Sequence, residues 1–331
     1  MGIPPFYCNR ESMDPILNAK NISLSQIDFE AFDYSLSPEL DAAPPEALYE
    51  SIARHGILHP PLVRELDSGL YTVVAGRKRL LVLRSLHTER TCICLVISRR
   101  VPEVDVFSLL LEESQLTRQL STVEKAIFLQ KITAIADERQ IISKFLPLLG
   151  LAPHSSSLKQ SLKLMDLEEP VLRSLHHGQI SETVAHDLLS MAARDRMTLA
   201  AIIVALRLSF SNQKKLLNMC RELASRSNTS IGALLDDNEV HDILQHPDAN
   251  PPQKTKNLML WLSRRHMPRS GQAKEEFSRF IAAMHLPRNV SVEHTPFFED
   301  DSMTLSITFP NRESLQHAWE KMRYATDNNE N

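Results

Sequence analysis

The segment 71–81, YTVVAGRKRLL, constrains the fold more than any other stretch of this chain. A β-rich run ends at Gly76, and a basic segment with helical character begins at the next residue. A strand that turns through glycine into a helix directs backbone N–H groups and the positive end of the helix dipole at one point, which suits a phosphate. Arg77, Lys78 and Arg79 add positive charge there. The alternative is a tight turn followed by a solvated basic helix, and the neighbouring segments favour the phosphate site.

The segments on either side predict a small α/β domain. Residues 47–55 have apolar residues at helical spacing, and Gly56 follows as a helix end signal. Residues 57–64 predict a strand, residues 67–69 (DSG) predict a hairpin turn, and residues 92–97 predict another strand. The expected order is therefore helix, strand, turn, strand, glycine, basic helix and strand.

This succession resembles the N-terminal domain of the ParB/RepB-type partition proteins. Residues 56–60 (GILHP) are similar to that family's G-[IL]-[IL]-Q-P box, and residues 75–79 (AGRKR) are similar to its A-G-E-R-R box. Residues 113–126 are similar to its E-N-x-Q-R-x-x-L-x-P-x-E-x-A box, with Glu113 and Glu124 in register. The order of the boxes is specific to the family, whereas each single box is not.

In that family the boxes form a CTP and Mg²⁺ site, so the resemblance implies a nucleotide site in this chain. The residues that it carries over are Gly56, His59, Pro60, Gly76, Arg77, Lys78, Arg79 and Glu113. Glu113 is also the implied Mg²⁺ ligand, because carboxylates are typical ligands of that ion. The alternative for Glu113 is an ordinary acidic pair with Glu112 at a helix end.

The chain departs from the family boxes at several positions. Arg77 stands where the family has a glutamate that is implicated in nucleotide hydrolysis. Ser114 replaces the usual asparagine, which weakens the metal site, and His59 replaces the usual glutamine. The arginine of the third box falls on Thr117, with Arg118 one position later. These changes predict no efficient catalysis and at most a weak CTPase.

A candidate helix-turn-helix follows in residues 140–165. Residues 150–153 (GLAP) predict the turn, and residues 154–164 predict a recognition helix with an apolar face behind a polar one. The predicted DNA-binding residues are His154, Ser155, Ser156, Ser157, Lys159, Gln160 and Lys163. Pro147 lies late in the first helix and removes a backbone hydrogen bond there. An ordinary amphipathic helix in a bundle is the alternative.

The expected fold class is α+β, in three parts, which suits a chain of 331 residues. Residues 1–120 are expected to be a small ParB-like α/β N-terminal domain that binds nucleotide or phosphate. Residues 121–245 are expected to be an all-helical DNA-binding domain, whose first helix begins with a capping box of Ser121 and Glu124. Residues 246–252 (HPDANPP) are expected to be a linker. Residues 253–331 are expected to be a helical and ββα unit.

The net charge of −4 argues mildly against a general binder of polyanions. Positive charge is nevertheless concentrated in residues 76–100 and 254–288, and such local fields attract phosphates. No apolar run is long enough to span a bilayer, and the N-terminal residues lack a secretory signal pattern. We expect a cytoplasmic, nucleoid-associated protein with no membrane partner.

The resemblance implies a CTP-responsive DNA-binding protein of chromosome or plasmid partition. It also implies a homodimer whose partners are DNA and a partition ATPase. Two alternatives stay open: a nucleotide-hydrolysing or phosphotransfer enzyme of the same fold, and an interaction adaptor without DNA binding. The sequence does not separate segregation from transcriptional regulation, because both use the same binding chemistry.

Overall fold

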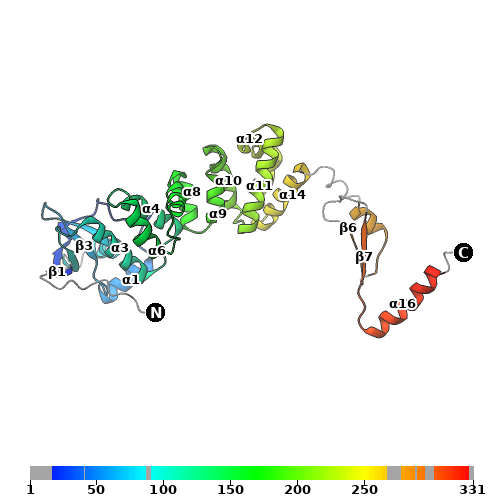
Figure 1. The fold of residues 1–331 in the computed structure, drawn as a ribbon, viewed down its shortest axis with the longest axis horizontal. Coiled ribbons are helices and arrows are strands. Elements are labelled where there is room, and N and C mark those ends of the chain that lie inside the picture. The colour runs from blue at the N-terminus through cyan, green and yellow to red at the C-terminus, as the bar shows by residue number, and fades with distance from the viewer. Residues whose placement is uncertain are drawn as a thin grey trace. The chain divides into compact units, whose positions relative to one another are not determined.

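The computed structural model describes residues 17–40, 42–86, 91–266, 277–287, 289–294 and 302–327. The contacts divide the chain into two compact units, residues 1–214 and 215–331. Figure 1 shows their elements in chain order, from the blue strands of the first unit to the red helix of the second. The expected domain borders near residues 120 and 245 stay a prediction.

The first unit begins with a mixed sheet of five strands in the order β1-β5-β3-β4-β2. The strands are β1 (Leu17–Ser23), β2 (Ile27–Asp28), β3 (Leu62–Glu65), β4 (Tyr71–Ala75) and β5 (Thr91–Ile97). β1 runs antiparallel to β5, and β3 runs antiparallel to β4. β3 is parallel to β5, and β2 is parallel to β4, so the crossover connections carry helices.

Helices supply the apolar partners of both faces of this sheet. They are α1 (Glu46–His55), α2 (Arg77–Leu86), α3 (Glu103–Thr117) and α4 (Thr122–Ile132). Successive strand residues point to opposite faces, so Val63 packs in a cluster with Leu80 of α2, whereas Leu62 packs in a second cluster with Phe128 of α4. Because both faces of the sheet are buried, the sequence of β4 is nearly continuously apolar.

The rest of the first unit is helical. Its elements are α5 (Glu138–Gln140), the π-helical turn η2 (Ile141–Phe145), α6 (Leu146–Leu148), α7 (Ser155–Lys163), the 3₁₀ turn η3 (Leu164–Asp166), α8 (Glu169–His176), α9 (Glu182–Leu188) and α10 (Ala193–Ala205). Phe128 lies with its ring centroid 5.9 Å from that of Phe107 and 5.6 Å from that of Phe145. These aromatic contacts join the sheet and the following helices into one apolar cluster.

Several local signals are confirmed. Ser121 and Glu124 form a reciprocal capping box at the start of α4. Gly56 ends α1 with φ of 69°, and Gly76 turns β4 into α2 with φ of 88°, a region that favours glycine. The predicted linker is shorter than expected, because its two final prolines open α14 (Pro251–His266), and the first turn of a helix tolerates proline.

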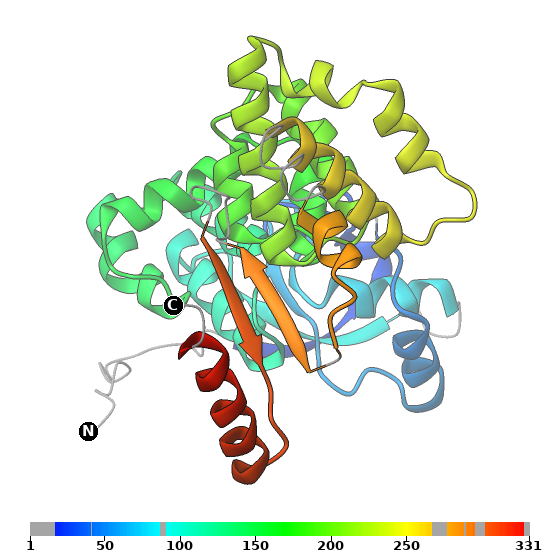
Figure 2. The same cartoon turned by 90° about the vertical axis from the view of Figure 1, so that its right-hand side faces the viewer.

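The second unit contains most of α11 (Phe210–Ser227), then α12 (Ile231–Leu235), α13 (Asn238–Gln245) and α14. A small ββα unit follows: β6 (Val290–His294), β7 (Met303–Ile307) and α16 (Arg312–Asp327). Figure 2 shows β6 and β7 side by side, and they pair antiparallel. The α+β class with a C-terminal ββα unit is therefore confirmed. Among the described residues, no helix combines the length and the apolar character that a membrane span requires.

Candidate functional site

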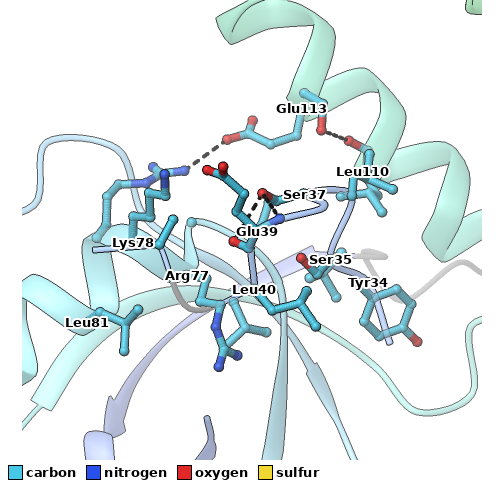
Figure 3. Close-up of a pocket in the computed structure, with 18 of the residues that line it drawn as sticks. Tyr34, Ser35, Ser37, Glu39, Leu40, Arg77, Lys78, Leu81, Leu110 and Glu113 are labelled. Atoms are coloured by element: carbon cyan, nitrogen blue, oxygen red, sulfur yellow. Dashed lines mark hydrogen bonds and ion pairs between the residues drawn. The ribbon is translucent and has the colours of Figure 1, made fainter. Parts of the chain in front are cut away.

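A cavity of about 260 Å³ opens where β4 turns into α2. Its walls come from three segments: residues 31–42, the turn at residues 73–81, and residues 110–118 at the end of α3. Figure 3 shows side chains of these three segments around the cavity, with Glu113 on the helix above and Lys78 at the turn. The predicted glycine turn and the predicted acidic box therefore meet at one place.

Two physical features favour glycine at position 76. Its φ of 88° strains any residue with a side chain. A Cβ at this position would also lie 3.0 Å from Nε and Nη2 of Arg79, which occupies that space. The first hydrogen bond of α2 runs from the Leu80 amide to the Gly76 carbonyl at 3.2 Å. The amides before Leu80 lie at the helix N-terminus, where a regular helix offers them no carbonyl acceptor. The start of α2 is thus a site that favours an anion.

Three cations line the cavity with different partners. Lys78 is exposed. Arg79 donates from Nη2 to Glu113 Oε1 at 3.3 Å and from Nη1 to the carbonyl of His59. Arg118 forms a two-point pair with Glu124, with 2.6 Å from Nη1 to Oε2. A polyanionic ligand in the cavity therefore meets positive charge on two of its three walls.

Arg77 also lines the cavity, but its guanidinium has other neighbours. It donates to the carbonyl of Phe29 and, at 3.2 Å, to that of Ala31, and it lies 4.0 Å from the ring centroid of Phe32. Figure 3 shows its side chain extending away from Lys78. The predicted phosphate contact of Arg77 stays a prediction. Because the guanidinium is occupied by the loop, we propose a different role for it below.

The residues of the first box lie beside the cavity and not in its lining. Gly56 follows the last residue of α1 and has a positive φ, a conformation that glycine adopts easily. His59 contributes its backbone carbonyl to Arg79, while its side chain and that of Pro60 are exposed. This box therefore helps to hold the side chain of Arg79, which belongs to the wall formed by residues 73–81.

Glu113 is the predicted Mg²⁺ ligand, and its carboxylate is paired with Arg79. Within the residues that the structure describes, no group of three or more His, Cys, Asp or Glu side chains is arranged to hold a metal ion. Mg²⁺ commonly uses one or two carboxylates and takes its other ligands from phosphates and water. The donor set therefore fits Mg²⁺ only together with the phosphates of a ligand.

Residues 34–40 form a wall that the sequence reasoning missed. Tyr34 and Leu36 are buried, while Ser35 and Ser37 between and after them are partly exposed. The alternation of apolar and polar residues is typical of an extended segment with one buried face, and this pattern is the signal from which the wall could have been predicted. The serines line the cavity and offer hydroxyl groups to a ligand.

Glu39 places a carboxylate on the same wall. Its Oε1 lies 2.8 Å from Nε2 of His177 and 3.6 Å from Nε of Arg173, at the end of α8. The hydrogen bond from His177 lowers the pKa of Glu39, and both the charge of His177 and that of Arg173 act in the same direction. The wall is thereby connected to the helical part of the first unit.

The predicted recognition helix is α7. It begins after His154, which has extended backbone, and it buries Leu158. Ser155, Ser156, Lys159, Gln160 and Lys163 are exposed together, and Ser157 is partly buried. The exposed face continues into a concave surface of about 820 Å³, which also contains Thr183, His186 and Asp187 of α9, together with Asp166 and Arg196. Such a face of small polar and cationic groups suits contact with DNA.

The predicted first helix of the helix-turn-helix is not regular. It is divided into α5, the π-helical turn η2 and α6. The extra residue of a π turn precedes Pro147, whose ring cannot fit the regular ladder. The Leu151 amide donates to the Leu146 carbonyl at 2.9 Å and closes the end of this segment.

Comparison with known proteins finds the ParB N-terminal domain family over residues 13–114. The nucleoid occlusion protein of Listeria monocytogenes serotype 4a (strain HCC23) is 24% identical over 151 residues, which are 46% of this chain and 50% of that protein. The chain therefore spans about half the length of the curated relatives that it matches.

Two solved structures of the C-terminally truncated chromosome-partitioning protein ParB from Caulobacter crescentus are also similar. The complex with the centromeric parS site is 18% identical and covers 60% of this chain and 98% of that one, with a TM-score of 0.34. The complex with CTP-γ-S is 19% identical and covers 56% and 99%, with a TM-score of 0.22.

Proposed function

We propose that this chain, whose residues 13–114 match the ParB N-terminal domain family, is a DNA-binding protein of chromosome or plasmid partition that responds to CTP. The single observation that carries the proposal is the start of α2 at Gly76, which opens on a cavity lined by cations. The choice of CTP follows the family resemblance of the three boxes.

In this proposal the triphosphate binds at the first turn of α2. Backbone amides at this helix N-terminus would donate to phosphate oxygens, and Lys78 and Arg79 would balance the phosphate charge. Mg²⁺ would be held by the phosphates and by Glu113. Arg77 is assigned no contact with phosphate, because its guanidinium is directed at the loop.

Arg118 gives the nucleotide a way to affect the helices. It lines the cavity and holds the buried Glu124, which caps α4 through Ser121. Ser121 Oγ in turn lies 2.8 Å from Nδ1 of His176 in α8. Phosphates that attract Arg118 would compete with Glu124 for it, so occupancy of the cavity would alter the contact between α4 and α8.

The DNA would lie along the exposed face of α7. Lys159 and Lys163 would contact phosphates, and Ser155, Ser156 and Gln160 would reach base edges or sugar. We further propose a homodimer, a partition ATPase as partner and association with the nucleoid, each from the family resemblance. The division into domains at residues 1–120, 121–245 and 253–331 belongs to the same proposal.

The test is DNA binding by fluorescence anisotropy at two salt concentrations, with and without CTP and Mg²⁺. The proposal predicts affinity that falls steeply as salt rises, because phosphate contacts release counterions. It also predicts that CTP with Mg²⁺ changes this affinity, whereas ATP does not. Binding that ignores CTP would refute the nucleotide response, and no binding to any DNA would favour the adaptor alternative.

A further inference from the structure

The segment of residues 29–33 leads into the wall of the cavity without belonging to a helix or a strand. Backbone amides and carbonyls that leave the solvent need hydrogen-bond partners, and an irregular segment cannot take them from a regular ladder. Side chains from distant parts of the sequence supply many of these partners. The position of the wall therefore depends on them.

Arg77 takes two of the carbonyl groups. It reaches the carbonyls of Phe29 and Ala31 from the start of α2, 48 and 46 residues away in sequence. Its stacking on the ring of Phe32 adds a contact with the same segment. One side chain thus fixes the beginning of the segment to the turn that forms the anion site.

Lys131 takes the next two carbonyl groups from the other side. Its Nζ lies 2.9 Å from the carbonyl oxygen of Phe32 and 2.7 Å from that of Asp33. It belongs to α4, and burial lowers the pKa of its ammonium. The desolvated ammonium gains these carbonyls as acceptors, so the contact is specific in geometry.

The amide groups of the segment are held as well. Asp28 Oδ1 accepts from the amides of Glu30 at 2.9 Å and Ala31 at 3.2 Å. Immediately after the segment, the hydroxyl of Tyr34 donates to Glu103 Oε1 at 2.5 Å. The backbone is therefore fixed at successive residues before the wall of residues 34–40 begins.

We infer that Arg77 and Lys131 are positioning residues of the cavity: they hold the backbone of residues 29–33 so that residues 34–40 stand as its wall, and they do not touch the ligand. Lys131 is absent from the residues that line the cavity. Arg77 does line it, but its guanidinium donates to the carbonyls of Phe29 and Ala31 and points away from Lys78 (Figure 3). The identity of the ligand as a nucleotide rests on the proposed function. The inference about the wall rests on the contacts that Arg77 and Lys131 make with residues 29–33.

The first test measures CTP and CMP affinity by isothermal titration calorimetry. Lys131→Met should weaken both nucleotides by the same factor, about tenfold, because a charge-assisted contact that shapes the wall is lost. Lys125→Met, on the same helix, should bind as the wild type does. Lys78→Gln should weaken CTP much more than CMP. A Lys131→Met variant that loses CTP alone, or that keeps full affinity for both, would overturn the inference.

The second test does not depend on any ligand. Limited proteolysis with chymotrypsin should cleave within residues 29–40 faster in Lys131→Met and Arg77→Gln than in the wild type. Lys131→Arg, which keeps a cationic donor, should restore resistance, and circular dichroism should show all variants folded. Unchanged cleavage would overturn the positioning role. Absence of nucleotide binding by the wild type would refute the proposed function, while the cleavage rates would still decide the role of the two cations.

Discussion

Arg79 Nη2 lies 3.3 Å from Glu113 Oε1, and this pair joins the start of α2 to α3 across the candidate nucleotide cavity. The two side chains are only partly exposed, at 20% and 33%. Because Arg79 also donates to the His59 carbonyl, it connects the three segments that resemble the family boxes. The pair is the feature that an incoming phosphate would have to share or displace.

Replacement of Glu113 tests this competition. Glu113→Gln removes a carboxylate that competes with phosphate for Arg79, so we expect CTP to bind about threefold more tightly in buffer without Mg²⁺. With Mg²⁺, the wild type should gain affinity and the variant should not. Glu112→Gln makes the same change of charge on the adjacent, exposed residue and serves as the control in calorimetry. Identical Mg²⁺ dependence in both variants would contradict the role of Glu113.

Gly76 provides a test of the anion site with a matched control. Gly76→Ala adds strain at φ of 88° and a Cβ that would lie 3.0 Å from the Arg79 guanidinium, whereas Gly69→Ala at φ of 81° meets no atom within 4 Å. Both variants should lose about 1 kcal/mol of stability. Only Gly76→Ala should lose nucleotide affinity. Equal affinity in the two variants would show that Arg79 does not depend on this glycine.

Glu124 links the stability of the first unit to pH. Burial alone would raise the pKa of Glu124, but hydrogen bonds from Arg118 and from the Ser121 amide lower it below its ordinary value of 4.5. A depressed pKa stabilises the fold above the ordinary value, and this contribution is lost as pH falls through the folded value. As pH falls below about 4.5, the Tm of Glu124→Gln should therefore decrease less steeply than the Tm of the wild type.

The same variant should be destabilised near pH 7. We expect a decrease of about 2 kcal/mol in the free energy of unfolding, less than for a fully buried pair because Arg118 can be hydrated. Glu169→Gln breaks an exposed pair with Arg173 and should change stability by less than about 0.5 kcal/mol. Urea unfolding of the two variants would show whether the buried carboxylate matters more than the exposed one.

The DNA-binding face of α7 predicts a change in salt dependence. Lys159→Gln and Lys163→Gln should each weaken DNA binding and reduce the slope of log affinity against log salt by about 1, because each removes one phosphate contact. Lys20→Gln, on the exposed surface of β1, is the control. Anisotropy titrations over a range of salt would contradict the proposal if all three variants kept the slope of the wild type.

The sequence predicted those parts of the fold that local chemistry determines. The turn at Gly76, the end of α1 at Gly56 and the capping box of Ser121 and Glu124 each depend on residues close in sequence. The order of strands could not be derived, since β1 pairs with β5, which lies far from it in the sequence.

The candidate site was predicted in part for the same reason. The turn and Glu113 could be predicted from the resemblance to the family boxes. Residues 34–40 carry only a short alternation of apolar and polar residues, which does not say against which elements the segment packs. Its place depends on Arg77, Lys131 and the contacts of Glu39 with α8, which join residues far apart in sequence. The direction of the Arg77 side chain is likewise a tertiary property that a run of three cations does not reveal.

The most direct measurement is a calorimetric titration of the wild type and Lys78→Gln with CTP in the presence of Mg²⁺. Lys78 lines the cavity, is exposed and lies at the start of α2, so its removal should weaken binding with little effect on the fold. We predict saturable binding of CTP by the wild type and clearly weaker binding by the variant. No binding by the wild type, or equal binding by both proteins, would contradict the assignment of this cavity as the nucleotide site.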